Sequence, residues 1–505
     1  MFEALEMPDR DVRGGAAVAA WARVENAAAA RRLAAIASVL QARLAASNAA
    51  EREQWCLDNW AAVSAEVAAA MGVTLGAASH QLMVARALAD RLPRVADVFA
   101  AGEVSYRLIN TIVFRTALIK QEEALAKVDA ELAAHISGWG SLSAAKLEGA
   151  IDYWVDRYDP YALRRIEIHA RNRHADFHIP DGSGVGSLWA RMYAHDAVAL
   201  DKRLDAMARA VCDADGRDLD QRRADALGAF ASGADRLSCN CGESDCAAAG
   251  VTPSNAVIHV VADESSLAES EEARLNGAEP ERPTAGKPLQ EQTIAEAFWQ
   301  PAPKGPTDAT PGVLIGGGLL PAPVLATLAP RALVRTIVHP GDSPPEPRYR
   351  PSAKLDEFVR CRDMTCRYPG CDVPAWDCDI DHTISYPAGP TQAANLKCLC
   401  RNHHLLKTYW SGSDGWRDRQ LPDGTVVWTS PDGLTHTTEP GSRLQFPALC
   451  RPTAAVTVRG ETVVATGVMM PRRSRTRAQD RAARIDAERR LNEDYVAERN
   501  RPPPF

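Results

Sequence analysis

The feature that most constrains this chain is a run of metal-binding residue types within residues 361–410. Cys366 and Cys371 lie on either side of a Tyr-Pro-Gly turn, which can bring their sulfur atoms to one ion. Cys400 and His403 lie at the start of the expected helix RNHHLLKTYW, where residues three apart share a face. Two such pairs complete the closed, four-coordinate shell of structural zinc. We therefore expect these four residues to bind Zn²⁺ and to tie together a segment with little apolar core.

A second set of residues in the same segment offers oxygen and nitrogen ligands. Asp381 and His382 lie in an expected strand, DCDIDHTISY, and are followed by Asn395 and His404. Adjacent side chains on a helix point about 100° apart, so His404 can face a second ion while its neighbour faces the zinc. Adjacent side chains of a strand also alternate, so one member of the Asp-His pair can bind a metal beside the other.

These residues resemble the His-Asn-His (HNH) endonuclease family, whose fold is the ββα-metal or His-Me finger motif. The family signature is an Asp-His pair on a first strand, an Asn further along and a His on the following helix, framed by zinc-binding pairs. Those positions are held here by Asp381, His382, Asn395 and His404. The second zinc pair of the family is Cys-x2-Cys, and His403 stands here in place of the second Cys.

The strings CRYPGCDVPAWDCDIDHT and NLKCLCRNHHLLKT, followed by GWRDRQLPDGTVVWTSPDG, are similar to one actinobacterial group. Its proteins join a helical N-terminal domain of unknown function (DUF222) to a C-terminal HNH domain, and the mycobacterial thirteen-E-twelve repeat family belongs to it. The resemblance implies a multidomain fold, with an α-helical N-terminal domain and a small α+β, zinc-framed nuclease domain. It also implies DNA as the partner and endonuclease activity.

The resemblance and the chemistry of phosphodiester hydrolysis together assign roles to these residues. Asp381 and His404 are expected to hold one Mg²⁺ or Mn²⁺ ion, which neutralises the phosphate and assists the leaving 3′-oxygen. Neutral His382 takes a proton from water near pH 7. By analogy, Asn395 orients His382 through its backbone or its side chain. Three basic residues are expected to contact phosphate groups: Lys407, Arg401 and Arg367. For the two arginines, an ordinary surface role is an open alternative.

A second cysteine cluster occurs in CNCGESDC. Cys239, Cys241 and Cys246 lie within eight residues and favour a second zinc site. A fourth ligand is not evident, and His259 is a guess. A loop with reduced thiols is the alternative.

Residues 15–262 are expected to form a helical domain that includes this cluster, because apolar residues recur there at helical spacing. Gly72 separates two such runs, and Thr74 is a suitable N-cap. This pattern resembles a helix-turn-helix with a second helix from about Leu75 to Leu92. Two packed helices of a bundle are the alternative. The polar groups of the second helix that could face DNA are His80, Gln81, Arg86 and Arg91.

The remaining segments differ in composition. They are expected to be an acidic linker rich in proline and glycine over 263–311, a connector over 312–350, the nuclease domain over 351–412, short strands with Pro-Asp-Gly turns over 413–450, and an arginine-rich tail over 471–505. The uncharged stretch 311–330 contains four prolines and four glycines, so we expect a turn-rich connector there and not a membrane span. For the tail we expect a loose helix or disorder, with nucleic-acid contact as the alternative.

The overall composition sets limits on partners and location. A chain of 505 residues with 46% hydrophobic and 24% charged residues is typical of globular proteins, and its length suggests about three domains. The net charge of −7 means that DNA binding must depend on local positive charge. The N-terminal residues lack the apolar core of a signal peptide, so we expect a cytoplasmic protein without membrane association. The alternatives to an endonuclease are a non-catalytic zinc-containing DNA-binding protein and a helical scaffold that binds protein.

Overall fold

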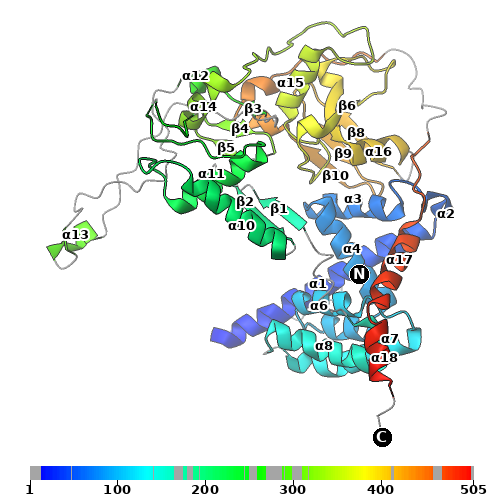
Figure 1. Cartoon of the computed structure of the whole chain (residues 1–505). Coiled ribbons are helices and arrows are strands. Elements are labelled where there is room, and N and C mark those ends of the chain that lie inside the picture. Colours follow the sequence, from blue (N-terminus) through cyan, green and yellow to red (C-terminus); the bar gives the residue numbers. More distant parts are fainter. Residues whose placement is uncertain are drawn as a thin grey trace. The chain divides into compact units, whose positions relative to one another are not determined.

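The computed structural model of the chain describes the following residues: 13–46, 48–139, 142–163, 174–178, 186–192, 194–243, 245–249, 259–268, 287–288, 291–297, 310–316, 318–410, 415–458 and 469–501. The chain divides into two compact units (Figure 1). Unit 1 contains Met1–Ile168, His339–Arg443 and Ala448–Phe505, and unit 2 contains His169–Val338 and Leu444–Pro447. This division separates the helical region expected over 15–262 into two parts and divides the expected connector 312–350 between the units.

The N-terminal part of unit 1 is a bundle of helices. They are α1 (Gly14–Leu44), α2 (Ala49–Arg52), α3 (Asn59–Met71), α4 (Leu75–Asp90), α5 (Pro93–Ala100), α6 (Tyr106–Thr116), α7 (Glu122–His135), η1 (Ile136–Trp139), α8 (Ala144–Tyr158) and η2 (Pro160–Ala162). Their apolar faces form one core, in which Leu33, Leu82, Phe99 and Ile112 are buried. Burial of these faces stabilises the helices, because helix propensity alone leaves short helices marginal in water.

Helices α3 and α4 correspond to the expected helix-turn-helix pair. Helix α3 ends at Gly72, whose φ of 64° is left-handed, and Thr74 caps α4 by accepting a hydrogen bond from the Ala77 amide at 3.3 Å. The two helices meet at 109°, within the range of about 90–120° for this motif. Among the described residues, no single helix is long and apolar enough to cross a membrane, and α3 and α4 pass that test only as this bent pair.

Two of the four polar residues that we expected to face DNA, His80 on α4 and Arg91 directly after it, have partners elsewhere in the bundle. The Arg91 guanidinium donates to the carbonyl oxygens of Thr116 and Ile119, so the expectation for Arg91 is wrong. His80 Nε2 lies 2.9 Å from Asn110 Oδ1 on α6. Helix α4 packs against α1, α3, α5 and α6, as in the bundle alternative. DNA contact by its other polar residues stays a prediction.

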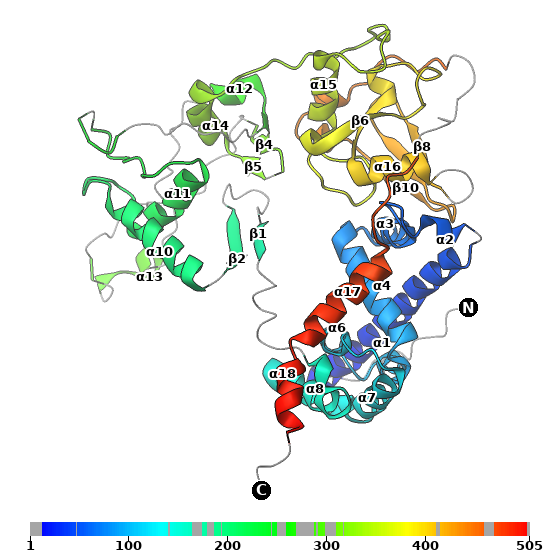
Figure 2. The ribbon, with the colours of Figure 1, turned by 45° about the vertical axis from the view of Figure 1, so that its right-hand side comes forward.

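The C-terminal part of unit 1 is mixed α and β (Figure 2). Its elements are α15 (Ala353–Asp363), η5 (Ala375–Asp377), β6 (Cys378–His382), η6 (Ala393–Asn395), β7 (Leu396–Cys400), α16 (Arg401–Tyr409), β8 (Arg417–Gln420), β9 (Val426–Thr429), β10 (Thr435–Thr438), η8 (Gly441–Arg443), α17 (Arg477–Arg490) and α18 (Glu493–Arg499). Strands β6 and β7 form an antiparallel pair, and β8, β9 and β10 form a three-stranded antiparallel sheet. The two Pro-Asp-Gly turns join the strands of that second sheet, as the sequence indicates, and Gly424 and Gly433 have φ of 86° and 88°.

The arginine-rich tail folds as helices on the N-terminal bundle. Helix α17 begins with a capping box. Arg477 pairs with Asp58 at 2.9 Å and Arg489 with Asp159 at 2.6 Å, and both carboxylates are buried. The expectation of a loose helix or disorder is therefore wrong for residues 471–501, because these arginines compensate buried carboxylates of the bundle.

Unit 2 contains shorter elements. They are β1 (His174–His178), β2 (Ser187–Arg191), α10 (Ala194–Arg209), α11 (Leu219–Ala231), β3 (Val260–Val261), α12 (Glu264–Leu267), α13 (Ile294–Ala297), β4 (Gly312–Leu314), β5 (Leu319–Leu320), α14 (Ala322–Leu328) and η4 (Ala329–Arg331). Strands β1 and β2 are antiparallel, and a second sheet has the order β3-β4-β5. The uncharged stretch 311–330 forms β4, β5, α14 and part of η4. Much of the expected linker 263–311 lies outside the described residues.

Candidate functional site

Strands β6 and β7 and helix α16 carry the residues expected to perform chemistry. The register of the strands pairs Asp381 with Lys397 and His382 with Leu396. Cys400 is the last residue of β7 and the N-cap of α16, so the helix begins where the strand ends. This continuity places His403 and His404 in the first turn of a helix that packs against both strands.

The structure brings together all four residues expected to bind structural zinc. The ligand atoms of Cys366, Cys371, Cys400 and His403 lie within 4.8 Å of one another. His403 Nδ1 is 3.2 Å from Cys400 Sγ and 3.5 Å from Cys366 Sγ, and the sulfur atoms of Cys371 and Cys400 are 4.0 Å apart. A tetrahedral Zn²⁺ with bonds of about 2.3 Å to sulfur and 2.0 Å to nitrogen places its ligand atoms about 3.5–3.8 Å apart. The four side chains therefore fit a zinc ion.

Contacts with the N-terminal bundle hold this cluster in place. The ring of His403 stacks on Tyr368, with centroids 3.8 Å apart, and the Tyr368 hydroxyl donates to the carbonyl oxygen of Ala65 at 3.2 Å. Gly370, in the turn between the first two cysteines, has a φ of 71°, and a Cβ there would lie 2.9 Å from the carbonyl oxygen of Val73. Only glycine fits both this backbone conformation and this close approach.

The surroundings of the thiols in this cluster shift their pKa values in different directions. Burial raises the pKa of Cys366, whereas hydrogen bonds with Cys366 and Cys371 lower the pKa of Cys400. Bound zinc favours the deprotonated form of every ligand thiol.

A second pair of ligand atoms lies on the other side of α16. His404 Nε2 faces Asp381 Oδ1 at 3.6 Å, and His404 Nδ1 lies 2.8 Å from Asp379 Oδ2. An Nδ1–H that donates to Asp379 leaves the Nε2 lone pair directed at Asp381. Metal-binding histidines characteristically have such a carboxylate partner. Asp379 was not predicted from the sequence, although alternate residues of a strand share a face and Asp381 is two positions away.

The buried Lys397 and the partly buried Lys407 hold the Asp381 carboxylate. The Nζ atoms of Lys397 and Lys407 each lie 2.7 Å from Asp381 Oδ2. Burial opposes ionisation of Asp381, but the charges of both lysines outweigh it and lower the pKa of the carboxyl group. Lys407 Nζ also donates to the carbonyl oxygen of His382 at 2.6 Å. The ammonium group of Lys407 therefore binds Asp381 and the His382 carbonyl oxygen, and the structure does not support its expected contact with phosphate.

The two arginines expected at the phosphate lie in different environments. Arg367 is only 3% exposed and donates to the main-chain carbonyl oxygens of Thr438 and Glu439, so it joins two segments of the fold. The expectation that Arg367 contacts phosphate is wrong, because its guanidinium is buried. The Arg401 side chain is 66% exposed and lies 3.4 Å from Asp379.

His382 is fixed by Thr391 and covered by Tyr349. His382 Nε2 is 2.9 Å from Thr391 Oγ1, and this hydroxyl donates to the Tyr349 carbonyl oxygen at 3.4 Å. The rings of Tyr349 and His382 stack with centroids 5.2 Å apart. Burial, reinforced by the positive charges of two lysines, lowers the pKa of His382 to about 4. The imidazole is therefore neutral near pH 7. The sequence analysis missed Thr391 and Tyr349, for which the motif holds no signal.

Asn395 positions the loop after His382 and does not contact the imidazole ring. Its carbonyl oxygen accepts from the Thr383 amide at 2.8 Å. Its side chain accepts from the Ile384 amide at 2.9 Å and donates to the carbonyl oxygens of Ile384 and Pro390. The expected orientation of His382 by Asn395 is therefore indirect, through the backbone that follows the histidine.

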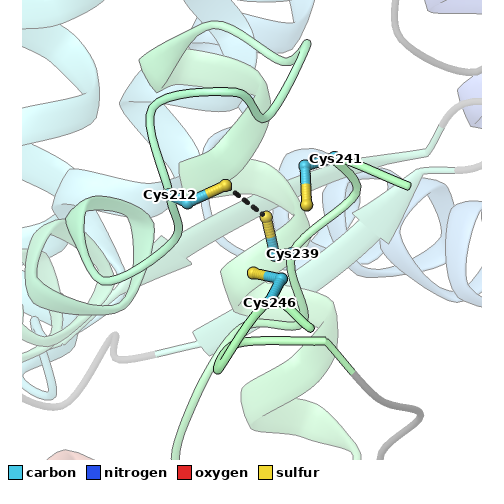
Figure 3. Close-up of side chains that lie close together, drawn as sticks. All are labelled: Cys212, Cys239, Cys241 and Cys246. Atoms are coloured by element: carbon cyan, nitrogen blue, oxygen red, sulfur yellow. Dashed lines mark hydrogen bonds between the residues drawn. The ribbon is translucent and has the colours of Figure 1, made fainter. Parts of the chain in front are cut away.

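In unit 2 the structure brings Cys239, Cys241 and Cys246 together with Cys212 (Figure 3). The fourth member of this group is thus Cys212, and the guess of His259 is wrong. Cys212 lies 27 residues before Cys239, too far for a local spacing pattern to reveal the pairing.

Comparison with known proteins identifies the family of the chain. The family described as "Domain of unknown function (DUF222)" matches residues 20–297 and 300–363. An uncharacterized protein of Mycobacterium tuberculosis strain CDC 1551 / Oshkosh, MT2160, is 52% identical over 502 residues, covering 97% of this chain and 89% of the relative. Another, Rv3776 of strain H37Rv, is 50% identical over 499 residues, covering 97% of this chain and 91% of the relative.

No solved structure matches the chain. The family match ends at residue 363, before the cysteine and histidine clusters of unit 1, and covers more than half of the sequence. The chain therefore belongs to the DUF222 family.

Proposed function

We propose that this protein is a metal-dependent DNA endonuclease that hydrolyses phosphodiester bonds. The observation that carries the proposal is the distance of 3.6 Å between Asp381 Oδ1 and His404 Nε2. The residue that follows Asp381 is His382, whose imidazole is neutral near pH 7. One carboxylate oxygen and one imidazole nitrogen at this separation can bind a common ion after a shift of a few tenths of an ångström, since adjacent ligands of such ions lie about 3.0–3.4 Å apart. DNA as the substrate follows from the resemblance to HNH endonucleases.

Asp381 and His404 would hold the divalent ion. When bound, Mg²⁺ or Mn²⁺ neutralises charge on the phosphate and stabilises the leaving 3′-oxygen. Lys397 and Lys407 keep Asp381 ionised through its second oxygen. Asp379 holds His404 in the tautomer whose lone pair is on Nε2.

His382 acts as the general base in this proposal. Its Nε2–H donates to the Thr391 hydroxyl, which leaves a lone pair on Nδ1. Nδ1 takes a proton from water while the water oxygen bonds to phosphorus and the bond from phosphorus to the 3′-oxygen breaks. The low pKa of His382 keeps this nitrogen unprotonated throughout the physiological range.

A plasmid-nicking assay tests the proposal. The full chain, loaded with zinc and supplied with Mg²⁺ or Mn²⁺, is expected to relax supercoiled plasmid, and EDTA is expected to stop the reaction. His382→Ala should lower the rate about 10²–10⁴-fold, the contribution of a general base. His135→Ala removes a half-exposed histidine of α7 and serves as the matched control, with the rate expected to stay that of the unaltered chain.

Two outcomes would overturn the endonuclease assignment. Equal nicking by the unaltered chain and by His382→Ala would mean that another protein in the preparation cleaves the plasmid. Binding of the plasmid without metal-dependent cleavage would favour the alternative of a zinc-containing DNA-binding protein.

A further inference from the structure

Unit 2 contains a second group of sulfur atoms. The Sγ atoms of Cys212, Cys239, Cys241 and Cys246 lie within 4.8 Å of one another, and those of Cys212 and Cys239 are 3.3 Å apart (Figure 3). The thiols are free, and all four residues are partly buried. A tetrahedral zinc ion with four sulfur ligands places the sulfur atoms about 3.8 Å apart. The cluster therefore has the size of a zinc–thiolate centre.

Main-chain amides direct hydrogen bonds at these sulfur atoms. The amide of Ala214 donates to Cys212, that of Cys241 donates to Cys239, and that of Glu243 donates to Cys241. The amide of Cys212 also donates to Cys239. N–H groups aimed at sulfur stabilise thiolates, the form in which cysteine binds metals. Main-chain N–H groups thus face three of the four sulfur atoms.

The turn through this cluster depends on a glycine. Gly242 follows Cys241 directly and has a φ of 79°, in the left-handed region. This conformation reverses the chain between Cys241 and Cys246 at no steric cost for glycine. The amide of Cys239 meanwhile donates to the carbonyl oxygen of Ala248 at 2.8 Å, which closes the loop.

Hydrogen bonds from an ion-paired Asp215 and Arg217 hold the two ligand-bearing segments side by side. Arg217 Nη2 lies 2.6 Å from Asp215 Oδ2 and 2.8 Å from the Ser238 carbonyl oxygen. The Asn240 amide donates to the same Asp215 oxygen at 2.8 Å. Residues 215–217 are therefore fastened to residues 238–240, and Cys212 is brought to the other three cysteines by contacts that do not involve sulfur.

The apolar core beside the cluster is small. It consists of Met207, Val211, Ala226 and Leu237, with three partly buried neighbours. Cys212 directly follows Val211, and Cys239 lies two residues after Leu237, so the ligands lie at the edge of this core. Small cores are commonly stabilised by a bound metal or by disulfides. A metal at these cysteines would join the end of α10 to the loop that follows α11.

We propose that Cys212, Cys239, Cys241 and Cys246 bind one Zn²⁺ ion in a closed, structural site of unit 2. Four thiolates in a tetrahedron select zinc or iron among common metals, and zinc is the metal of closed structural sites. Because all four positions are filled by protein, the ion has no free position for substrate. This site goes beyond the proposed nuclease function and does not depend on it.

Zinc content of the purified full chain tests the proposal. The unaltered chain is expected to hold two zinc ions, one in each cluster. Cys212→Ser should hold one, and Cys366→Ser, in the other cluster, should also hold one. Cys450→Ser removes a buried cysteine outside both clusters and is the matched control, expected to hold two.

Further measurements keep the test decisive if Cys212→Ser folds poorly. Cys212→His supplies another zinc ligand and is expected to keep two ions. The unaltered chain, refolded with Co²⁺ in place of zinc, should show the visible absorption of tetrahedral cobalt–thiolate at two equivalents. An unchanged zinc content in Cys212→Ser, iron in place of zinc in this cluster, or a disulfide between any two of the four cysteines would overturn the proposal.

Discussion

The two cysteine clusters are built from similar ligands but lie in different surroundings. The cluster of unit 1 has three buried members and stacks His403 on the buried Tyr368. The cluster of unit 2 has four partly buried members beside a core of four buried residues. The first also adjoins two carboxylates, two imidazoles and two lysines. Under the two proposals, similar metal chemistry frames a reactive site in one unit and replaces missing apolar core in the other.

The largest difference between the two clusters is expected in how much of each unit unfolds when zinc is removed. Structural zinc contributes about 10–16 kcal/mol in zinc-finger peptides, whereas whole domains are stable by about 5–15 kcal/mol. We expect a chelator to unfold residues 194–249 of unit 2, because little apolar core remains there without the ion. Helices α1–α8 of unit 1 should stay folded. Hydrogen exchange of backbone amides, with and without chelator, measures both regions in one sample.

The substitution Cys212→Ser tests the same expectation without a chelator, because it removes one zinc ligand of unit 2. It should raise exchange over α10 and α11 while leaving plasmid nicking by unit 1 unchanged. If the amides of α10 and α11 stay protected from exchange after zinc is lost, the cluster does not stabilise unit 2. It then contributes no more to the stability of its unit than the first cluster contributes to the stability of the helical bundle.

The difference between the clusters also explains what could be predicted from sequence. The four ligands of unit 1 fall into two local pairs, and local spacing was enough to find them. Cys212 comes from a distant segment, which is joined to the other cysteines by hydrogen bonds of Arg217 with the Ser238 carbonyl oxygen and of the Asn240 amide with Asp215. Partners defined by tertiary contacts, such as Thr391 beside His382, leave no pattern in the sequence.

The environment of charged residues was harder to predict than their position along the chain. Arg367 and Arg401 look alike in the sequence, but one guanidinium is buried against carbonyl oxygens and the other is exposed. The arginine-rich tail looked solvated, but its helices compensate buried carboxylates such as Asp58. The strands at the Pro-Asp-Gly turns were predictable because such turns depend on local backbone geometry.

Substitution of Asp379 tests whether the first cluster frames a second metal site. Asp379→Asn keeps the size of the side chain but weakens its hydrogen bond with His404 Nδ1. Loss of such a partner typically lowers metal affinity about 10–100-fold. We expect nicking to require that much more Mn²⁺, with the maximal rate largely retained. Asp377→Asn alters an exposed carboxylate just before β6 and is the control. An unchanged Mn²⁺ requirement would remove Asp379 from the site and leave the His404 tautomer unexplained.

The smallest effect is expected from substitution of one exposed arginine beside each cluster, measured on DNA binding. Arg401 follows Cys400 in unit 1, and Arg236 lies near the cysteines of unit 2, with its guanidinium on the Ala247 carbonyl oxygen. An arginine that contacts one phosphate adds about one unit to the slope of DNA affinity against salt concentration. Arg401→Ala should therefore weaken DNA binding at low salt and reduce this slope by about one, because its charge lies beside the proposed cleavage site. Arg236→Ala should change neither quantity. Equal losses from the two variants would show that DNA contacts both clusters, and the division into a catalytic frame and a structural clamp would no longer hold.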